Sequence, residues 1–160
     1  MPRLSAGLLL YRAGAGCRLE VLIAHMGGPF WARKDAGAWS IPKGEHEEGE
    51  DPLAVARREF EEELGQPPPA GDPVLLGEFR QSGGKRVMVF AQEGDCDVTE
   101  IRSNHFSVEW PPRSGQLQSF PEVDRAEWTE IEAARERLVR GQVPALDALL
   151  ERLRDGAVEA

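Results

Sequence analysis

Carboxylate side chains are concentrated in one short stretch of the chain. Residues 45–63 hold nine aspartates and glutamates against two arginines, which accounts for seven of the nine net negative charges of the 160-residue protein. Carboxylates crowded in this way repel one another unless a cation lies between them. Their oxygen atoms suit a hard divalent cation such as Mg²⁺, which keeps several waters and takes its other ligands from phosphate. The sequence therefore predicts a divalent-metal site in this stretch.

The flanking residues predict the helix that positions these carboxylates. Asp51 followed by Pro52 combines a capping side chain with a proline at a position that needs no amide hydrogen. Gly65 followed by Pro67 is typical of a helix end. Between these signals, the residues that share one stripe at helical periodicity are predicted to face a core, and they are Leu53, Ala56, Phe60 and Leu64.

Three glutamates lie on an adjoining stripe of the same predicted helix. Glu59, Glu62 and Glu63 fall within about 100° of one another, so their carboxylates converge beside the buried face. Arg58 lies one turn before Glu62 and can hold a carboxylate in a fixed orientation. A solvated acidic helix is the alternative, but such a helix would not need the arginine–glutamate pair and the double glutamate at this register.

The spacing of these residues resembles the Nudix box, G-x5-E-x7-R-E-U-x-E-E-x-G-U, where U is a bulky apolar residue. The matching residues are Gly44, Glu50, Arg58, Glu59, Phe60, Glu62, Glu63 and Gly65. The last position differs, because Gln66 stands where the family has an apolar residue. That position is structural in the family, so the difference bears on local packing. The resemblance covers essentially the whole chain, although only the box is specific.

The resemblance implies a hydrolase that uses Mg²⁺ or Mn²⁺ to cleave a nucleoside diphosphate linked to another group. In such an enzyme, metal ions neutralise the pyrophosphate charge, bind the attacking water and lower its pKa. Arg58 would orient Glu59. The implied metal-binding groups are Glu59, Glu62, Glu63, the backbone carbonyl near Gly44 and, behind them or on a further ion, Glu50.

The general base is implied to lie outside the box. Related enzymes often use a glutamate in the loop that enters the last strand, and the corresponding residue is Glu122, six residues before Trp128. A solvated loop acid is the alternative for this residue. Glu109 and Asp124 are weaker candidates for the same role.

Candidate substrate contacts lie next to the box and elsewhere along the chain. Lys43 stands in a Pro-Lys-Gly step, which resembles family members that cleave dinucleoside polyphosphates and diphosphoinositol phosphates, where a lysine reaches phosphate. Further phosphate candidates, each of which alone is more often a solvated charge, are Arg33, Lys34, Arg80, Lys85, Arg86 and Arg113. Phe30, Trp31 and Trp39 could stack on a base, with a core position as the alternative. His25, His46 and His105 show no metal-ligand spacing and are predicted to be structural or exposed.

The substrate subclass stays open at this stage. Diadenosine polyphosphate hydrolases often carry a tyrosine at the position occupied here near Gly83 and Gly84, and ADP-ribose hydrolases often carry a proline where Gln81 stands. The NADH-type motif does not occur. The Pro-Lys-Gly step favours a polyphosphorylated substrate, while nucleoside triphosphate clean-up is the alternative. A binding module on the same fold that no longer catalyses is the rival from another class, and the intact carboxylates argue against it.

We expect one α/β domain over residues 1–160. Strands on both sides of the acidic helix, followed by C-terminal helices, predict an α/β/α sandwich around a mixed sheet, with the box helix on one face. The predicted strands cover residues 5–11, 19–24, 39–42, 74–81, 85–92, 104–110 and 126–131. A helical turn is predicted at 98–101, helices at 132–140 and 144–154, and a frayed tail at 155–160.

Composition limits the partners and the compartment. An apolar content of 41% is enough for a core, and the net charge of −9 argues against binding to duplex nucleic acid or an anionic membrane. The apolar run at 6–11 is too short for a signal peptide or a membrane span. Cys17 and Cys96 show no paired spacing and are predicted to be reduced. We therefore expect a cytoplasmic protein with a small nucleotide or polyphosphate ligand. The sequence leaves its oligomeric state open, and a homodimer is one of the alternatives.

Overall fold

The computed structural model describes residues 3–159, which form nine strands and three α-helices. The strands are β1 (Leu4–Ala13), β2 (Leu19–Met26), β3 (Trp39–Ser40), β4 (Lys43–His46), β5 (Val74–Arg80), β6 (Arg86–Glu93), β7 (His105–Glu109), β8 (Leu117–Pro121) and β9 (Val123–Glu130). The helices are α1 (Pro52–Leu64), α2 (Ile131–Arg137) and α3 (Val143–Glu159), and a short 3₁₀ turn, η3 (Arg140–Gln142), precedes α3.

A mixed sheet of seven strands forms the centre of the molecule. Its main order is β3-β2-β1-β6-β5, with β4 paired to β1 and β9 paired to β2. β1 runs parallel to β6 and antiparallel to β2 and β4. The strand β4, which opens the box, thus lies directly against the central strand, and α1 follows it.

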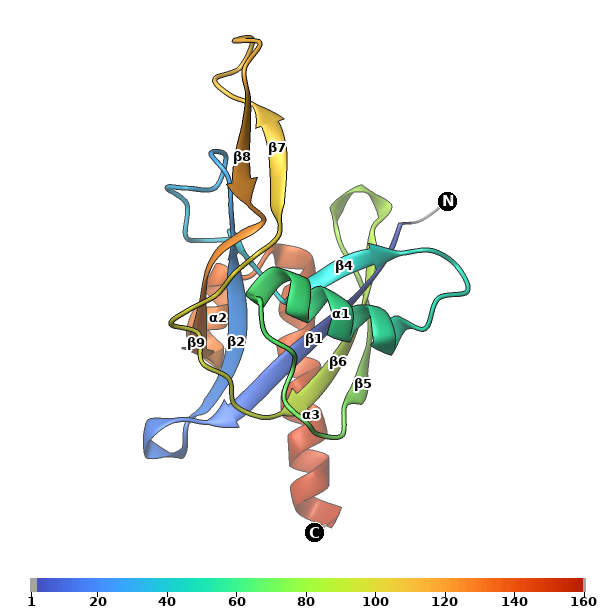
Figure 1. Cartoon of the computed structure of the whole chain (residues 1–160). Coiled ribbons are helices and arrows are strands. Elements are labelled where there is room, and N and C mark those ends of the chain that lie inside the picture. Colours follow the sequence, from blue (N-terminus) through green and yellow to red (C-terminus); the bar gives the residue numbers. More distant parts are fainter. Residues whose placement is uncertain (1–2, 160) are drawn as a thin grey trace.

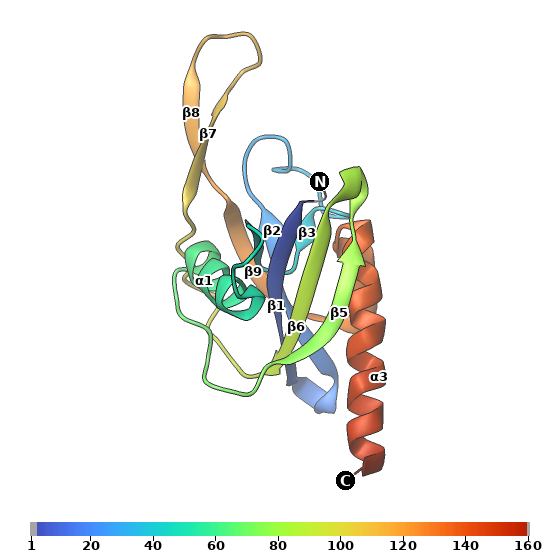
Figure 2. The same ribbon diagram turned by 90° about the vertical axis from the view of Figure 1, so that its right-hand side faces the viewer.

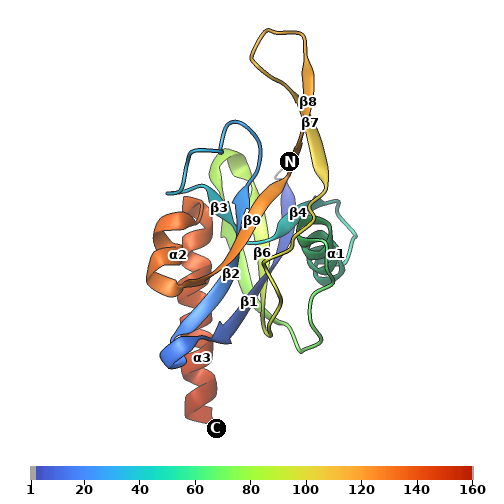
Figure 3. The same ribbon diagram turned by 60° about the vertical axis from the view of Figure 1, so that its left-hand side comes forward.

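Helices cover both faces of this sheet. Figures 2 and 3 show α1 on one side and α2 and α3 on the other. Neighbouring residues of β1 alternate between the two layers, because Leu9 belongs to the core under α2 and α3 whereas Leu8 and Leu10 belong to the core under α1. The predicted α/β/α sandwich with the box helix on one face is therefore confirmed.

The predicted ends of the box helix are confirmed. The Asp51 carboxylate accepts a hydrogen bond from the Leu53 amide (3.3 Å), and Pro52 is the first helical residue. Gly65 adopts a left-handed conformation (φ 77°), and its amide donates to the Glu61 carbonyl at 2.7 Å. The helix of 13 residues thus begins and ends where the capping residues predict.

The buried face of α1 differs from the prediction at one position. Ala56, Phe60 and Leu64 are buried as predicted, but the fourth buried residue is Val55, and Leu53 is only partly buried. On a helical projection, Val55 lies between Glu62 and Glu59, so that Glu59 and Glu63 fall between Val55 and Phe60. The buried arc therefore encloses two of the glutamates, which explains why they are shielded from solvent.

Two antiparallel strands leave the body of the protein as an arm. β7 and β8 pair with each other in a separate two-stranded sheet and project beyond the main sheet (Figure 1). At the base of the arm, Phe106 packs against Gly28, and further along it Trp110 meets Phe30 edge to face at 5.3 Å. Strand β7 was predicted, whereas β8 was not, because Leu117–Pro121 shows little apolar alternation and is mostly exposed.

Two other predictions about secondary structure are wrong. The segment 98–101 is not helical; it leads to Arg102 and Asn104, whose amides donate to the carbonyls of Leu64 (3.1 Å) and Glu62 (2.9 Å) at the end of α1. Residues 102–104 therefore cap α1, and 98–101 is the non-helical stretch that leads to them. The last helix does not end at 154, because α3 continues to Glu159; the last residue lies outside the described part of the chain.

Candidate active site

The three box glutamates predicted as metal ligands occupy one side of α1, next to β4. The Glu59 side chain is only 15% exposed and that of Glu62 is 40% exposed. A Cβ atom at Gly44 would collide with the Glu59 carboxyl group. Glycine at this position therefore lets the strand backbone and the helix carboxylate approach each other closely.

Glu63 is the most shielded of these carboxyl groups. Its Oε1 accepts a weak hydrogen bond from the Lys43 amide at 3.5 Å. Burial raises the pKa of Glu63 to about 8, and the Lys43 ammonium group opposes this shift only in part. Burial also lowers the pKa of Lys43, with the charge of Glu63 opposing. A buried carboxyl group with so little compensating charge is a group that a bound cation would stabilise.

Arg58 lies at the centre of the exposed side of the cluster. Its guanidinium group lies 3.5 Å from Glu59, 3.6 Å from Glu50 and 3.9 Å from Glu62. Glu50 is held in turn by the Glu47 amide at 2.8 Å, and this hydrogen bond lowers the pKa of Glu50. The predicted contact between Arg58 and Glu59 is thus present, and the same arginine also contacts Glu62 and Glu50.

Glu122 lies near the box carboxylates although it is far from them in sequence. Burial raises its pKa, and the charge of Glu62 adds to this effect. The charge of Glu122 in turn contributes to the raised pKa values of Glu59 and Glu63. The weaker base candidates are engaged elsewhere, since Glu109 accepts from the Gly115 amide in the arm and Asp124 contacts His25.

The backbone of Glu122 is fixed on both sides. Its amide donates to the Asn104 carbonyl (2.8 Å), and Asn104 is bonded to α1 through the Glu62 carbonyl. Its own carbonyl accepts from the Gly27 amide at 2.8 Å. A Cβ atom at Gly27 would collide with the Pro121 carbonyl, so this close approach of two backbones requires glycine.

The donor atoms fit a divalent cation, although they are not arranged as a finished site. Among residues 3–159, no three His, Cys, Asp or Glu side chains already have the arrangement of a metal site. The carboxyl groups of Glu59, Glu62 and Glu63 would have to turn toward a common point. All available donors are oxygens, the ligands that Mg²⁺ and Mn²⁺ prefer, and the space left by Gly44 keeps the Glu59 carboxyl group against the strand.

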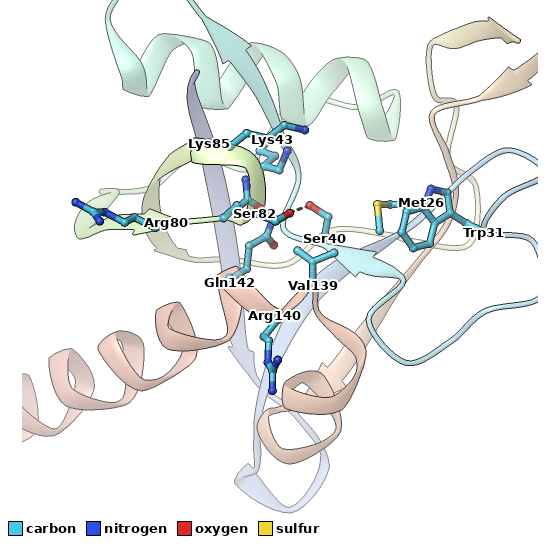
Figure 4. A pocket seen from close by; sticks show the side chains of 12 residues that line it. Met26, Trp31, Ser40, Lys43, Arg80, Ser82, Lys85, Val139, Arg140 and Gln142 are labelled. Atoms are coloured by element: carbon cyan, nitrogen blue, oxygen red, sulfur yellow. Dashed lines mark hydrogen bonds between the residues drawn. The ribbon is translucent and has the colours of Figure 1, made fainter. Parts of the chain in front are cut away.

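A cavity of about 500 Å³ is linked to the box through Lys43, which lines it and whose charge interacts with Glu63 and Glu59. Among the described residues, the cavity lining includes four cationic side chains and no acidic one, namely Lys43, Arg80, Lys85 and Arg140. Figure 4 shows Lys43 and Lys85 beneath α1, with Trp31 and Met26 at the other end of the cavity. The charge of Lys85 contributes to the lowered pKa of Lys43, so the two ammonium groups interact. The cavity therefore offers positive charge next to the carboxylates.

The wall of the cavity is held together by Gln142, which is fully buried. Its Oε1 accepts from the Ile41 amide (2.8 Å), and its Nε2 donates to Ser40 Oγ (3.0 Å) and Gln81 Oε1 (2.9 Å). These bonds join β3, the turn after β5 and η3. Because all of its polar atoms are engaged, Gln142 fixes the shape of the cavity and leaves the charged residues to meet a ligand.

The predicted substrate contacts have different outcomes. Lys43 and Lys85 line the cavity, whereas Arg33 is exposed on the 27–38 loop and does not line it. The prediction for Trp39 is wrong, because its ring is fully buried in the core and its Nε1 donates to Asp35 at 2.9 Å. A buried indole has no free face on which a base could stack; Trp31 lines the cavity instead.

Other residues of the site carry no signal in the sequence. Arg140 and Gln142 reach the cavity from the segment between α2 and α3, and nothing in their local pattern marks them. Gly27 and Asn104 position Glu122 through their backbones alone. Such contacts depend on which segments the fold brings together, so only a three-dimensional arrangement could identify them.

Both the fold and the arrangement of these residues are those of one known class of protein. Residues 1–149 match the family described as NUDIX domain, and the chain therefore belongs to the Nudix family. The resemblance of the box to this family is thus confirmed. No helix in the described part of the chain is long and apolar enough to cross a membrane.

The similarity to a curated relative covers only part of the chain. An RNA pyrophosphohydrolase of Rhodospirillum rubrum is 43% identical over 79 residues, a match that covers 48% of this chain and 44% of that protein. The match therefore spans less than half of the length of that relative.

Solved structures show the same architecture. An Ap4A hydrolase of C. elegans, solved as a binary complex, has a TM-score of 0.63 at 22% identity, and the match covers 96% of this chain and 98% of that protein. A mutT/nudix family protein of Listeria innocua has a TM-score of 0.66 at 15% identity and covers 100% and 99%. The NUDIX domain of NrtR of Shewanella oneidensis, complexed with ADP ribose, has a TM-score of 0.63 at 16% identity and covers 96% and 89%. At such identities the likeness establishes the fold alone.

Proposed function

We propose that this protein is a Mg²⁺- or Mn²⁺-dependent pyrophosphohydrolase that cleaves a nucleoside diphosphate linked to another group. The observation that carries the proposal is the contact between two oppositely charged regions. Lys43 lines the cavity, its backbone amide donates to Glu63 of α1, and its charge interacts with Glu63 and Glu59. A substrate that brings phosphates, together with a divalent cation, would compensate both sets of charges.

In this proposal Glu59, Glu62 and Glu63 hold the cation, and Arg58 keeps Glu59 and Glu62 in place. The cation would supply charge neutralisation at the phosphates and an acidified water nucleophile. Glu122 would accept a proton from the attacking water as the oxygen of the water forms a bond to phosphorus. The phosphoanhydride oxygen then leaves with the bonding electrons, so that one bond forms and one breaks. Lys43 neutralises negative charge on one of the two phosphates joined by the bond that is cleaved.

A polyphosphorylated nucleotide is the substrate class that the cavity favours. Lys43 and Lys85 offer positive charge on one side of the cavity, whereas the guanidinium groups of Arg80 and Arg140 extend away from it (Figure 4). Trp31 offers an aromatic wall for a base. The names of two similar proteins, an Ap4A hydrolase and an RNA pyrophosphohydrolase, support the same class. The 5′ end of a single-stranded RNA is a second candidate because of the 43% identity to the latter.

The test is a substrate panel with purified protein and Mg²⁺, with products resolved by chromatography. The panel contains nucleoside triphosphates, 8-oxo-guanosine triphosphate, diadenosine polyphosphates, ADP-ribose, NADH, a diphosphoinositol phosphate and a 5′-triphosphorylated RNA. We expect metal-dependent cleavage of a diadenosine polyphosphate or of the RNA end, and cleavage of nucleoside triphosphates alone would indicate a clean-up enzyme. Tight binding of metal and nucleotide without cleavage of any compound would refute the enzymatic proposal in favour of a binding module.

A further inference from the structure

One buried histidine has two hydrogen-bond partners that can only accept. His25 on β2 is fully buried. Its Nδ1 lies 2.8 Å from Asp124 Oδ1, and its Nε2 lies 2.7 Å from the Lys34 carbonyl oxygen. A carbonyl oxygen and an ionised carboxylate have no hydrogen to donate, whereas a neutral imidazole has only one N–H group. Both contacts can be hydrogen bonds only when both ring nitrogens carry a proton.

The first partner of His25 lies at an irregularity next to Glu122. In the pairing of β2 with β9, His25 faces Arg125 and Met26 faces Val123, so that Asp124 is an extra residue without a partner. Such a bulge bends the strand and redirects the residues beside it. The bond from His25 fixes this bulge two residues after Glu122, and the adjacent Gly27 amide holds the Glu122 carbonyl.

The second partner belongs to the loop that bounds the cavity. Lys34 lies on the 27–38 loop, and its amide donates to the Trp31 carbonyl at 3.0 Å. Trp31 lines the cavity. His25 therefore connects the segment that carries Glu122 with the loop that carries the aromatic wall of the cavity, and no other described side chain bonds to both Asp124 and the Lys34 carbonyl.

Several charged groups near His25 surround the indole ring of Trp39. Trp39 meets the imidazole edge on at 5.1 Å, and the guanidinium groups of Arg125 and Arg137 lie over the same indole at 5.1 and 5.0 Å. Asp35 accepts from Trp39 and pairs with Arg137 at 3.6 Å. The Asp124 carboxylate is the only charged side chain in direct contact with the ring among the described residues, so it alone compensates a proton placed there.

We infer that His25 is a positioning residue that carries a proton on both ring nitrogens, and that it sets the relative placement of Glu122 and the cavity loop. This inference rests on the proposed function. His25 touches neither phosphate nor the box carboxylates and therefore acts through the segments that it joins. Loss of one ring proton would leave one buried acceptor without its donor, which destabilises one of the two attachments.

The first experiment is NMR of the ring nitrogens in the intact protein labelled with ¹⁵N-histidine. The variant His46→Gln/His105→Gln removes the other two histidine signals, so that the remaining signal belongs to His25. We expect two N–H groups on this ring near neutral pH. A ring with a single N–H group would overturn the inference, and this result is independent of any substrate.

The second experiment compares Asp124→Asn with Glu127→Gln, since each removes one negative charge from β9. Asp124 is 30% exposed, so the asparagine variant can fold. We expect it to lose the second N–H signal of His25, to exchange the Gly27 amide hydrogen faster, and to lower kcat between about 10- and 100-fold with a KM change below about threefold. Glu127→Gln should keep both N–H signals of His25 and the exchange rate of the Gly27 amide hydrogen, because Glu127 does not contact the ring.

Two outcomes contradict the inference in this comparison. The first is equal kcat values in the two variants at every pH, and the second is unchanged Gly27 exchange in Asp124→Asn. If the wild-type protein cleaves nothing in the panel, the proposed function fails, whereas the ring spectrum and the amide exchange still decide the role of His25.

Discussion

The acidic side of α1 and the basic cavity beside it are built in different ways. The acidic side takes its three glutamates from one helix of 13 residues, where helical periodicity alone brings them together. The cavity takes its cationic residues from β4, the end of β5, the turn between β5 and β6, and the 3₁₀ turn before α3. A cluster on one helix tolerates changes elsewhere in the fold, while a cavity assembled from separate segments depends on their packing. Catalytic rate and substrate affinity should therefore respond to different substitutions.

The largest effect is expected from removing one carboxylate of the acidic side. Glu62→Gln should lower kcat by about 10³-fold or more, because an amide cannot supply the charge that a divalent cation needs. The melting temperature should stay nearly unchanged, since Glu62 is partly exposed. Glu61→Gln is the matched control, because Glu61 is exposed and lies one residue away on the same helix. Equal hydrolysis rates for wild type and Glu62→Gln would eliminate the catalytic role of this side.

A similar but smaller loss is expected at Glu122. Because Glu122 is the proposed base, Glu122→Gln should lower kcat by about 10²-fold or more. Metal affinity, measured by titration calorimetry, should change little. Glu109→Gln is the control, because Glu109 lies in the arm and accepts from Gly115. If Glu109→Gln lost activity while Glu122→Gln kept it, the base would have to be assigned to the arm.

Gly44→Ala tests whether the acidic side also depends on contact with β4. A Cβ atom would push the Glu59 carboxyl group away; because this group is the end of a flexible side chain, the cost in stability should stay below about 1 kcal/mol. We expect kcat to fall between about 10- and 100-fold, with weaker metal binding. Gly37→Ala is the contrast, since Gly37 has positive φ and open space around it, and it should lose stability without any change in metal affinity.

The difference between the two regions also explains how much could be predicted from the sequence. Asp51, Gly65 and the glutamate register are local signals, so the helix and its acidic side were predicted correctly. Glu122 could be named only through the family resemblance. Arg140 and Gln142 were missed because they reach the cavity through the packing of η3 against β3 and the β5–β6 turn. Trp39 was misplaced since the spacing of an aromatic residue does not show which side of the sheet covers it.

The pH dependence of stability sharpens the comparison from the acidic side. Burial raises the pKa of Glu63 to about 8, above the ordinary value of 4.5. The folded protein then binds more protons than the unfolded chain between these pH values, so stability falls as the pH rises through this window. In the presence of a chelator, we expect the free energy of unfolding, measured with urea, to fall by on the order of a few kcal/mol as the pH rises from about 5 to about 8. Glu63→Gln should remove most of this slope, and an unchanged slope in the variant would show that another group causes it.

The smallest effect is expected on the basic side, where charge is shared among several residues. Lys85→Gln should raise KM about tenfold for a polyphosphorylated substrate and leave kcat nearly unchanged, because a partly solvated contact with phosphate contributes on the order of 1 kcal/mol. Arg33→Gln is the control, since Arg33 is exposed and does not line the cavity. The KM effect should grow with the number of phosphates in the substrate and weaken at high salt, as expected for a charge–charge contact. A fall in kcat with constant KM would mean that Lys85 acts on the reacting phosphate. The assignment of kcat to the acidic side and of substrate affinity to the cavity would then be wrong.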